Sequence, residues 1–327
     1  MKGKIAFEEH FAIPDTSEQA KPFAGDSGVW DDFTREIMDL DEERLEHMDN
    51  SGIELALLSL NAPGLQSILN ADEAMNVAKK ANDKMAEAAQ KYPGRYGGMA
   101  ALPMHDPDAA SQELTRCVKE LGHKGILVNG FQQIDQPDNQ AYYDQPEYRT
   151  FWATVQELDV PFYLHPRMTI PSQARAYQDH PWLMSSPWGF AVETSTHALR
   201  LCGSGLFEDY PNLKICLGHL GEGIPFGLWR IDARMAFSPR GYRGLRPLGD
   251  YFRENFHLTI SGNFNDAAFR CTLDMFDNDK IYYSADYPFE RMEDASDWFD
   301  NTQEINDEQR QQMGRDHAIK LFKLDLE

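Results

Sequence analysis

The run KIAFEE, Lys4–Glu9, is a short apolar segment that ends on two glutamates and is followed at once by His10. Further short runs, rich in β-branched and aromatic residues, recur along the chain, and each is typical of a buried strand. Seven runs follow the first: Glu54–Leu60, Tyr96–Leu102, Gly125–Asn129, Val160–Leu164, Lys214–Leu217, Phe256–Ile260 and Lys280–Ser284.

Longer segments with helical spacing lie between these runs, several with an acidic residue or a proline in the first turn. These segments are Glu42–Ser51, Asp72–Lys91, Pro107–Leu121, Pro146–Leu158, Phe190–Asp209, Glu222–Phe237, Asp266–Phe276 and Asp307–Phe322. Strand followed by helix, eight times over, is typical of parallel βαβ units. Such units build either a doubly wound sheet or a closed barrel, and 327 residues suit one large barrel or two ordinary domains.

The residues that follow each strand favour the barrel, because barrel active sites gather at the carboxyl ends of the strands. These ends are polar here: Glu8, Glu9, His10, Asn61, Asn129, His165, His219, Ser261 and Asp286. Three long stretches on the same face, Ala12–Asp39, Gln132–Gln145 and Pro166–Gly189, could form the walls and lid of a pocket. We therefore predict an α/β fold, a (β/α)₈ TIM barrel with long βα loops that forms a single domain over residues 1–327.

Four of the strand-end residues have the chemistry of a metal site. Glu8 and His10 are two residues apart, so on an extended strand both point to one side, while Phe7 and Glu9 point to the other. His165 and Asp286 end later strands. Two carboxylates and two imidazoles suit Mn²⁺, Zn²⁺ or Fe²⁺ better than Mg²⁺ or Ca²⁺. Each residue alone could be a hydrogen-bonded structural group, but four at matching strand ends favour a metal site.

His219 and Glu222 lie three residues apart in LGHLGEG, a spacing that lets the carboxylate orient the imidazole for proton transfer. The alternative is that Glu222 only favours a helix N-terminus. Two arginines, Arg230 and Arg167, could hold a substrate carboxylate, although a salt bridge is the ordinary role for either. Three aromatic residues could stack on a substrate ring or simply line the rim of the barrel: Phe23, Trp188 and Phe289.

Composition narrows the range of partners. The chain has 31 Lys and Arg against 53 Asp and Glu, a formal charge of −22, which disfavours nucleic acid and anionic membrane surfaces. An anionic substrate would need a local positive charge from a metal ion or an arginine. Glutamates interrupt the opening residues, no window approaches a membrane span, and four cysteines are scattered without a C-x-x-C pair. We therefore expect a cytoplasmic protein with reduced thiols and no membrane segment.

Several stretches resemble one known family: GKIAFEEHFAIP, YYDQPEYRTFWATVQELDVPFYLHPR, GLFEDYPNLKICLGHLGEGIPFGLWRID, SADYPFE and GRDHAIKLFKLD. They are similar to the non-oxidative hydroxybenzoate decarboxylases of the amidohydrolase superfamily, and the resemblance covers essentially the whole chain. The motif E-x-H stands where the wider superfamily has H-x-H. His10 stands where fungal salicylate and 2,3-dihydroxybenzoate decarboxylases tend to have alanine, which favours a 2,6-dihydroxy substrate.

The resemblance implies one divalent ion, Mn²⁺ or Zn²⁺, held by Glu8, His10, His165 and Asp286, with no organic cofactor. It implies a homotetramer or dimer in which Arg230 acts across a subunit interface. Binuclear relatives carry a carbamylated lysine where Asn129 stands, so a mononuclear site is expected. Further implied roles are catalytic for Asp286, His219 and Glu222, and substrate-binding for Phe23, Asn129, Arg230 and Phe289.

The expected reaction is protonation of the ring carbon that bears the carboxylate, followed by loss of CO₂, with Asp286 as the proton donor. The substrate is a small aromatic acid, 2,6-dihydroxybenzoate first and 2,3-dihydroxybenzoate or salicylate as alternatives. A metal-dependent hydrolase of an ester, lactone or amide is a rival reading. A non-catalytic scaffold with a structural metal is a second rival, since barrels host many functions.

Overall fold

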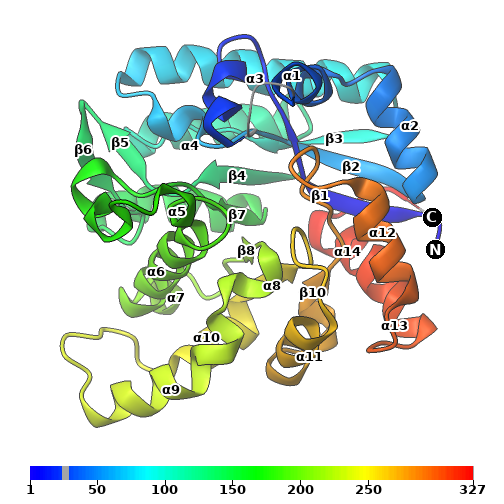
Figure 1. The fold of residues 1–327 in the computed structure, drawn as a ribbon. Coiled ribbons are helices and arrows are strands. Elements are labelled where there is room, and N and C mark those ends of the chain that lie inside the picture. The colour runs from blue at the N-terminus through cyan, green and yellow to red at the C-terminus, as the bar shows by residue number, and fades with distance from the viewer. Residues whose placement is uncertain (24–28, 327) are drawn as a thin grey trace.

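Eight parallel strands form the centre of the protein in the computed structural model (Figure 1). The structure describes residues 1–23 and 29–326, but not the side chains of residues 20, 22 and 23. The order of the strands is β1-β2-β3-β4-β7-β8-β9-β10, so neighbours in the sheet follow the order of the chain. All eight predicted runs are strands: β1 Lys4–Phe11, β2 Ile53–Leu60, β3 Tyr96–Ala100, β4 Gly125–Asn129, β7 Phe162–His165, β8 Ile215–Leu217, β9 Phe256–Thr259 and β10 Ile281–Tyr282. The predicted single-domain (β/α)₈ barrel is confirmed.

The segment after β10 closes the sheet onto β1. An isolated parallel bridge pairs Glu9 with Tyr287. The backbone N–H of His10 donates to the carbonyl of Tyr287 at 2.7 Å, and that of Asp286 donates to the carbonyl of Glu8 at 3.0 Å. The seam of the barrel therefore holds three of the four predicted metal ligands in register.

Helices cover the outside of the barrel (Figure 1). The predicted helical segments are present: α2 Glu42–Ser51, α3 Ala71–Lys91, α4 Pro107–Lys119, η3 Pro146–Tyr148 with α5 Arg149–Leu158, α6 Gly189–Gly203 with α7 Leu206–Asp209, α8 His219–Glu222 with α9 Ile224–Phe237, α11 Asp266–Met275, and α13 Asp307–Gln311, η7 Gln312–Asp316 and α14 His317–Phe322. Side-chain caps begin several of them. Asn265, for example, accepts hydrogen bonds from the N–H groups of Ala267 and Ala268 at the start of α11.

The predicted loops hold further elements. Three α-helices lie outside the predicted segments: α1 Trp30–Met38, α10 Leu248–Asn255 and α12 Met292–Asn301. A two-stranded hairpin, β5 Gln132–Ile134 and β6 Gln136–Ala141, lies in the stretch expected as a loop after the fourth strand. Short 3-10 turns complete the chain: η1 Ser17–Phe23, η2 Gly64–Ser67, η4 Pro171–Tyr177, η5 Pro181–Leu183 and η6 Asn278–Lys280.

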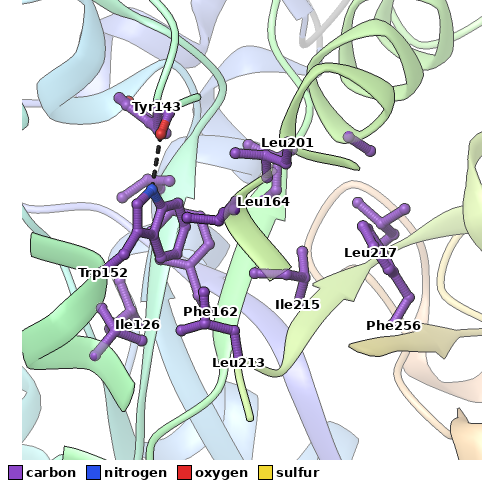
Figure 2. Close-up of a cluster of buried hydrophobic side chains, with 14 of the residues drawn as sticks. Ile126, Tyr143, Trp152, Phe162, Leu164, Leu201, Leu213, Ile215, Leu217 and Phe256 are labelled. Carbon is purple, nitrogen blue, oxygen red and sulfur yellow. Dashed lines mark hydrogen bonds between the residues drawn. The ribbon is translucent and has the colours of Figure 1, made fainter. Parts of the chain in front are cut away.

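The largest hydrophobic cluster lies between the barrel and its helices (Figure 2). Trp152 of α5 is fully buried there, and its ring lies 4.7 Å from that of Phe162 on β7. Its indole N–H donates to the carbonyl of Tyr143 at 2.7 Å, so the polar atom is satisfied as the ring is buried. Truncating such a side chain to alanine typically costs about 3–5 kcal/mol.

Phe7 was expected to point away from Glu8, and that prediction is wrong. The pairing of β1 with β2 shifts between Ala6 and Glu9, where one extra residue enters β1. Phe7 therefore lies inside the barrel, with its ring 6.0 Å from that of Tyr163, whose hydroxyl contacts the carboxylate of Glu8. A bulge of this kind reverses the alternation that an unbroken strand would have. Glu9 points outward as predicted, and its Oε1 accepts from the N–H of Ala285.

In the described part of the chain, no helix combines the length and the apolar character that crossing a bilayer requires.

Candidate metal centre

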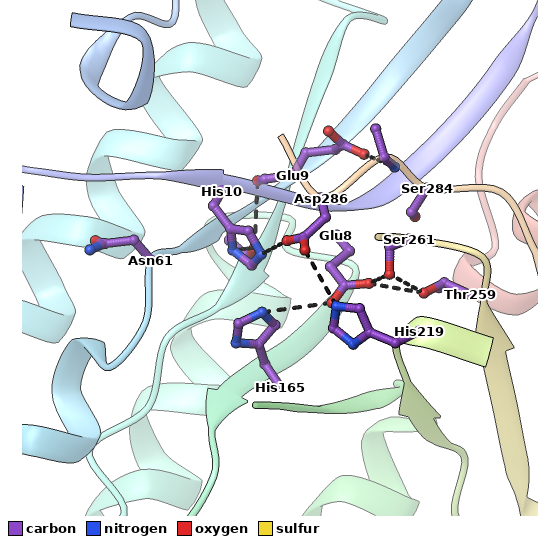
Figure 3. A network of polar contacts seen from close by, with 12 residues as sticks. Glu8, Glu9, His10, Asn61, His165, His219, Thr259, Ser261, Ser284 and Asp286 are labelled. Atoms are coloured by element: carbon purple, nitrogen blue, oxygen red, sulfur yellow. Dashed lines mark hydrogen bonds and ion pairs between the residues drawn. The ribbon is translucent and has the colours of Figure 1, made fainter. Parts of the chain in front are cut away.

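The four predicted ligands meet at the carboxyl end of the barrel (Figure 3). Glu8 and His10 come from β1, His165 from the end of β7, and Asp286 from the segment that follows β10. Each offers one ligand atom, and these atoms all lie within 4.8 Å of one another. All four residues are buried, so water does not screen their charges.

Hydrogen bonds from the described residues hold only one of the two carboxylate oxygens of Glu8. Its Oε2 accepts hydrogen bonds from the hydroxyls of Tyr163, Ser261 and Thr259, the last at 2.9 Å. Its Oε1 is buried, lies 3.7 Å from His165 Nε2, and has no hydrogen-bond donor in the described part of the chain. Burial raises the pKa of Glu8 to about 8. An unsatisfied buried carboxylate oxygen that faces two imidazoles is an arrangement that a cation stabilises.

The histidines are oriented toward the same point. His10 has Nδ1 within 3.0 Å of the hydroxyl of Ser59 and Nε2 within 3.0 Å of Asp286 Oδ1. Its ring packs edge to face against that of His165, with centroids 4.5 Å apart. The contact at Nδ1 fixes the ring and leaves Nε2 for the centre, as is usual for metal-binding histidines. Two oxygens and two nitrogens fit Mn²⁺, Zn²⁺ or Fe²⁺.

His219 links the cluster to Glu222. Its Nδ1 lies 2.7 Å from Glu222 Oε1 and its Nε2 lies 3.3 Å from Asp286 Oδ2. Burial lowers the pKa of His219, but the carboxylates of Glu222 and Asp286 outweigh burial and hold this pKa well above its usual value. Burial likewise raises the pKa of Asp286, and hydrogen bonds with His10 and His219 outweigh it and hold this pKa below its usual value. The predicted His219–Glu222 contact is present.

The backbone around this contact is in an unusual conformation. His219, Leu220 and Glu222 have φ angles of 53°, 58° and 55°, and Asp286 has 79°. The left-handed region is unfavourable for residues with a side chain, so each position costs stability that the surrounding packing must offset. Strain of this kind is found where a side chain has to be aimed, and here it aims His219 at Asp286.

A cavity of 130 Å³ opens over the cluster. His165, His219 and Asp286 form its polar floor, and two aromatic residues, Phe190 and Phe289, form part of its wall. It adjoins a wider cavity of 390 Å³ that shares His219 and Asp286. Since an engineered cavity of about 150 Å³ accommodates benzene, the smaller cavity suits a single aromatic ring whose polar group faces the ligands.

The other predicted residues lie at varying distances from this cavity. Phe289 lines it, with its ring 5.6 Å from that of His10. Asn129 is buried beside it at the end of β4, paired with His165. Arg230 lies exposed on α9 and is not among the described residues that line the cavity. The side chain of Phe23 lies outside the described residues, and Trp188 is 58% exposed.

Arg167, the second candidate for a substrate carboxylate, is buried and engaged elsewhere. Its guanidinium donates to the carbonyls of Gln66 and Phe131 at 2.9 and 2.8 Å and to Gln133 Oε1 at 2.6 Å. It also stacks over the ring of Phe131 at 4.0 Å. Arg167 therefore ties together the loops after β2, β4 and β7, and it is not among the described residues that line the cavity.

Sequence reasoning missed residues of two kinds. The first supports the ligands from inside the barrel, namely Tyr163 and Thr259 at Glu8 and Ser59 at His10. Their inward alternation along β7, β9 and β2 could have revealed them. The second lines the cavity, as Phe190 at the start of α6 and Glu290 in the segment after β10 do. The way in which long loops bring such residues to the cavity leaves no signal in the sequence.

Comparison with known proteins agrees with this geometry. A family model described as amidohydrolase matches residues 27–324, and the chain belongs to the amidohydrolase family. Within that family it is similar to gamma-resorcylate decarboxylases. It is 48% identical over 328 residues to the one from Rhizobium sp. (strain MTP-10005), with 99% of both chains covered. It is 49% identical over 327 residues to the one from Polaromonas sp. (strain JS666 / ATCC BAA-500), again with 99% of both covered.

Two solved structures of such decarboxylases have the same fold as this chain. The crystal structure of 2,6-dihydroxybenzoate decarboxylase complexed with 2,6-dihydroxybenzoate superposes with a TM-score of 0.97 at 48% identity, covering 99% of this chain and 100% of that one. The Polaromonas dihydroxybenzoic acid decarboxylase, solved with bound manganese and 2-nitroresorcinol, also gives a TM-score of 0.97 at 48% identity, covering 100% of this chain and 98% of that one.

Proposed function

We propose that this protein is a metal-dependent, non-oxidative decarboxylase that converts 2,6-dihydroxybenzoate reversibly to resorcinol and CO₂. One observation carries the proposal: a buried Glu-His-His-Asp cluster forms the floor of a ring-sized cavity, and a histidine bonded to a second carboxylate lies against it. Full-length similarity to gamma-resorcylate decarboxylases supports it. No organic cofactor is required, because an ortho hydroxyl already supplies electrons to the ring carbon.

Glu8, His10, His165 and Asp286 would hold one divalent ion, with Mn²⁺ proposed first and Zn²⁺ second. When bound, the ion supplies positive charge that grips the carboxylate and the adjacent ortho oxygen of the substrate. The substrate would enter between Phe289 and Phe190, with its ring over His165 and its carboxylate directed to the floor of the cavity.

Protons would move along the contacts between Glu222, His219 and Asp286. Glu222 orients His219 through Nδ1, and His219 passes a proton from Nε2 to Asp286. Asp286 delivers it to the ring carbon that carries the carboxylate. The new C–H bond replaces the C–C bond, whose electrons return to the ring as CO₂ departs. Run backward, the same contacts would remove the proton during carboxylation.

We further propose a homo-oligomer, a tetramer or dimer, in which Arg230 reaches the cavity of a neighbouring subunit and Asn129 and Phe23 complete the pocket. Support comes from α9, where Phe226, Trp229 and Phe237 are 89%, 76% and 77% exposed. Large apolar side chains gathered on one projecting helix mark an interaction surface. Trp229→Glu should yield smaller species in light scattering, with a raised KM, whereas Trp182→Glu, also at an exposed tryptophan, should not. An active wild-type monomer would refute this arrangement.

We also propose that the protein lies in the cytoplasm and takes part in the breakdown of aromatic compounds. The described chain contains no disulfide, since Cys117, Cys202 and Cys216 are free and buried and Cys271 is free and half-buried. This state is usual in a reducing compartment.

The decisive experiment incubates Mn²⁺-loaded protein separately with 2,6-dihydroxybenzoate, 2,3-dihydroxybenzoate and salicylate, and follows CO₂ and the phenolic product. CO₂ from the first is expected. Release only from the others would retain the chemistry and change the substrate. No release from any, with metal content confirmed, would favour hydrolysis of an ester, lactone or amide.

A further inference from the structure

Arg44 lies on α2, one of the helices outside the barrel, and its side chain is fully buried (Figure 1). The guanidinium reaches the seam where β1 meets the segment after β10. Its Nη2 donates to the carbonyl of His10 at 2.6 Å. The same group stacks over the ring of Tyr287, 4.8 Å from the ring centroid. One side chain therefore contacts the ligand His10 and the residue that follows the ligand Asp286.

The carbonyl of His10 depends on Arg44 for a donor. The N–H of His10 pairs with the carbonyl of Tyr287 across the seam, whereas the next carbonyl along β1, that of Phe11, faces β2 and accepts from the N–H of Asn61. Since successive carbonyls of a strand point to opposite sides, the carbonyl of His10 faces the seam. Arg44 satisfies it there, and a buried carbonyl without a donor would be unfavourable.

The end of α1 holds the guanidinium in place. Nε donates to the carbonyl of Asp39 at 3.0 Å, and Nη2 donates also to that of Glu36 at 3.3 Å. The last carbonyls of a helix have no partner within it, and the negative end of the helix dipole favours a cation there. Arg44 is therefore fixed between the end of α1 and the seam, and it braces one against the other.

This arrangement is an expensive way to gain stability alone. The acceptors of Arg44 in the described chain are backbone carbonyls, and its Nη1 is buried without any acceptor. A buried charge without a carboxylate partner pays a large desolvation penalty, and an apolar side chain of similar size is often no less stable. What an apolar side chain could not supply is the directed bond to the carbonyl of His10.

We propose that Arg44 is a positioning residue of the metal centre. By holding the backbone of His10 and the ring of Tyr287, it keeps His10 Nε2 and Asp286 Oδ1 at the separation of 3.0 Å from which both can reach one ion. The inference deepens the proposed function and rests on the metal centre assigned there. Residues that orient metal ligands from outside typically contribute about 10- to 100-fold to metal affinity.

The test is the affinity of Arg44→Met for Mn²⁺, measured from the electron paramagnetic resonance signal of the free ion. Methionine retains much of the length and the apolar packing of arginine but has no donor. The dissociation constant should rise by about tenfold or more. Binding is measured on the folded protein, so a loss of overall stability does not by itself change the result.

Arg310→Met is the matched control. Arg310 is also buried, donates to the carbonyls of Phe299 and Thr302, and lies over the ring of Phe299 at 5.8 Å. Its described contacts include no residue of the metal centre. Denaturant unfolding should show a loss of stability in this variant as in Arg44→Met, but its affinity for Mn²⁺ should equal that of the wild type.

Wild-type affinity in folded Arg44→Met would overturn the proposal, and so would an equal loss of affinity in Arg310→Met. If Arg44→Met does not fold, Arg44→Lys replaces it. Lysine keeps the charge but lacks the planar fork that joins the carbonyls and stacks on the ring, so weaker binding is again expected and wild-type affinity would overturn the proposal.

The comparison separates this proposal from the proposed function. If the wild type binds Mn²⁺ but releases no CO₂ from any hydroxybenzoate, the decarboxylase assignment fails while the affinity comparison still tests Arg44. If the wild type binds no Mn²⁺, both are refuted.

Discussion

Glu8 shows, at the scale of a single residue, how a carboxylate is prepared for a metal ion. Three hydroxyls fix one of its oxygens, and the other faces His165 without a donor. The three hydroxyls would hold the side chain in place whether or not an ion is bound. The ligand oxygen is therefore oriented in advance, so little ordering is left for the metal to drive.

Replacing Glu8 with glutamine tests this role with little change of shape. The amide lacks the charge that balances the ion, so we expect metal content to fall to near zero and decarboxylation to disappear with it. Elemental analysis and CO₂ release measure the two effects. Glu290→Gln, a charge change at the exposed rim of the cavity, is the control and should retain the metal. Full activity in metal-free Glu8→Gln would contradict the assignment.

His219→Asn should separate proton transfer from metal binding. The asparagine cannot pass a proton from Glu222 to Asp286, so kcat should fall by about 10²–10⁴-fold. Metal content should be retained, because His219 is not one of the four ligands. His47→Asn, at a half-buried histidine paired with Glu293 on the barrel surface, is the control. Wild-type kcat in His219→Asn would remove this histidine from the mechanism.

At the scale of elements, the central strands were predictable and the loop insertions were not. Strands buried on both faces have continuous apolar runs, which is why all eight were found. β6, QPDNQA, has a proline and no β-branched residue, and most of it is exposed, so nothing in its sequence indicates a strand. The ligands were found because they end strands, whereas the inward turn of Phe7 depends on a bulge that sequence alone does not reveal.

The side-chain cap that begins α11 has a measurable effect on stability. Asn265 accepts two backbone hydrogen bonds at the start of α11, and both are lost in Asn265→Ala. We expect the free energy of unfolding to fall by about 1 kcal/mol. Asn265→Asp should retain most of the stability because its carboxylate accepts the same bonds. Denaturant unfolding of the three proteins measures the difference, and equal stability of Asn265→Ala would show that the cap contributes nothing.

At the scale of the whole molecule, buried neutral histidines make stability depend on pH. Burial lowers the pKa of His197 to about 3 and that of His123 to about 4, whereas both would be about 6.5 in the unfolded chain. Between these values the unfolded state binds more protons than the folded state. Stability is therefore complete above about pH 6.5 and falls as the pH drops below it, by up to about 1.4 kcal/mol per unit for each histidine.

His197→Gln isolates this effect, because the amide oxygen can replace Nε2 as the acceptor for the N–H of Tyr143. Thermal unfolding at pH 7.5, 6.5 and 5.5 should show a smaller loss of stability with acid in this variant than in the wild type. Other titrating groups are common to both proteins, so the difference between the two slopes reports His197. Parallel slopes would mean that the pKa of His197 is the same in the folded and unfolded states.

The seam that joins β1 to the segment after β10 also decides when the site can form. His10 and Asp286 lie 276 residues apart in the sequence. A nascent chain therefore carries the first two ligands for nearly the whole of its synthesis without the last one. Metal capture has to wait until the ribosome has released almost the entire protein, and no proteolytic fragment that lacks either end of the barrel can retain the complete centre.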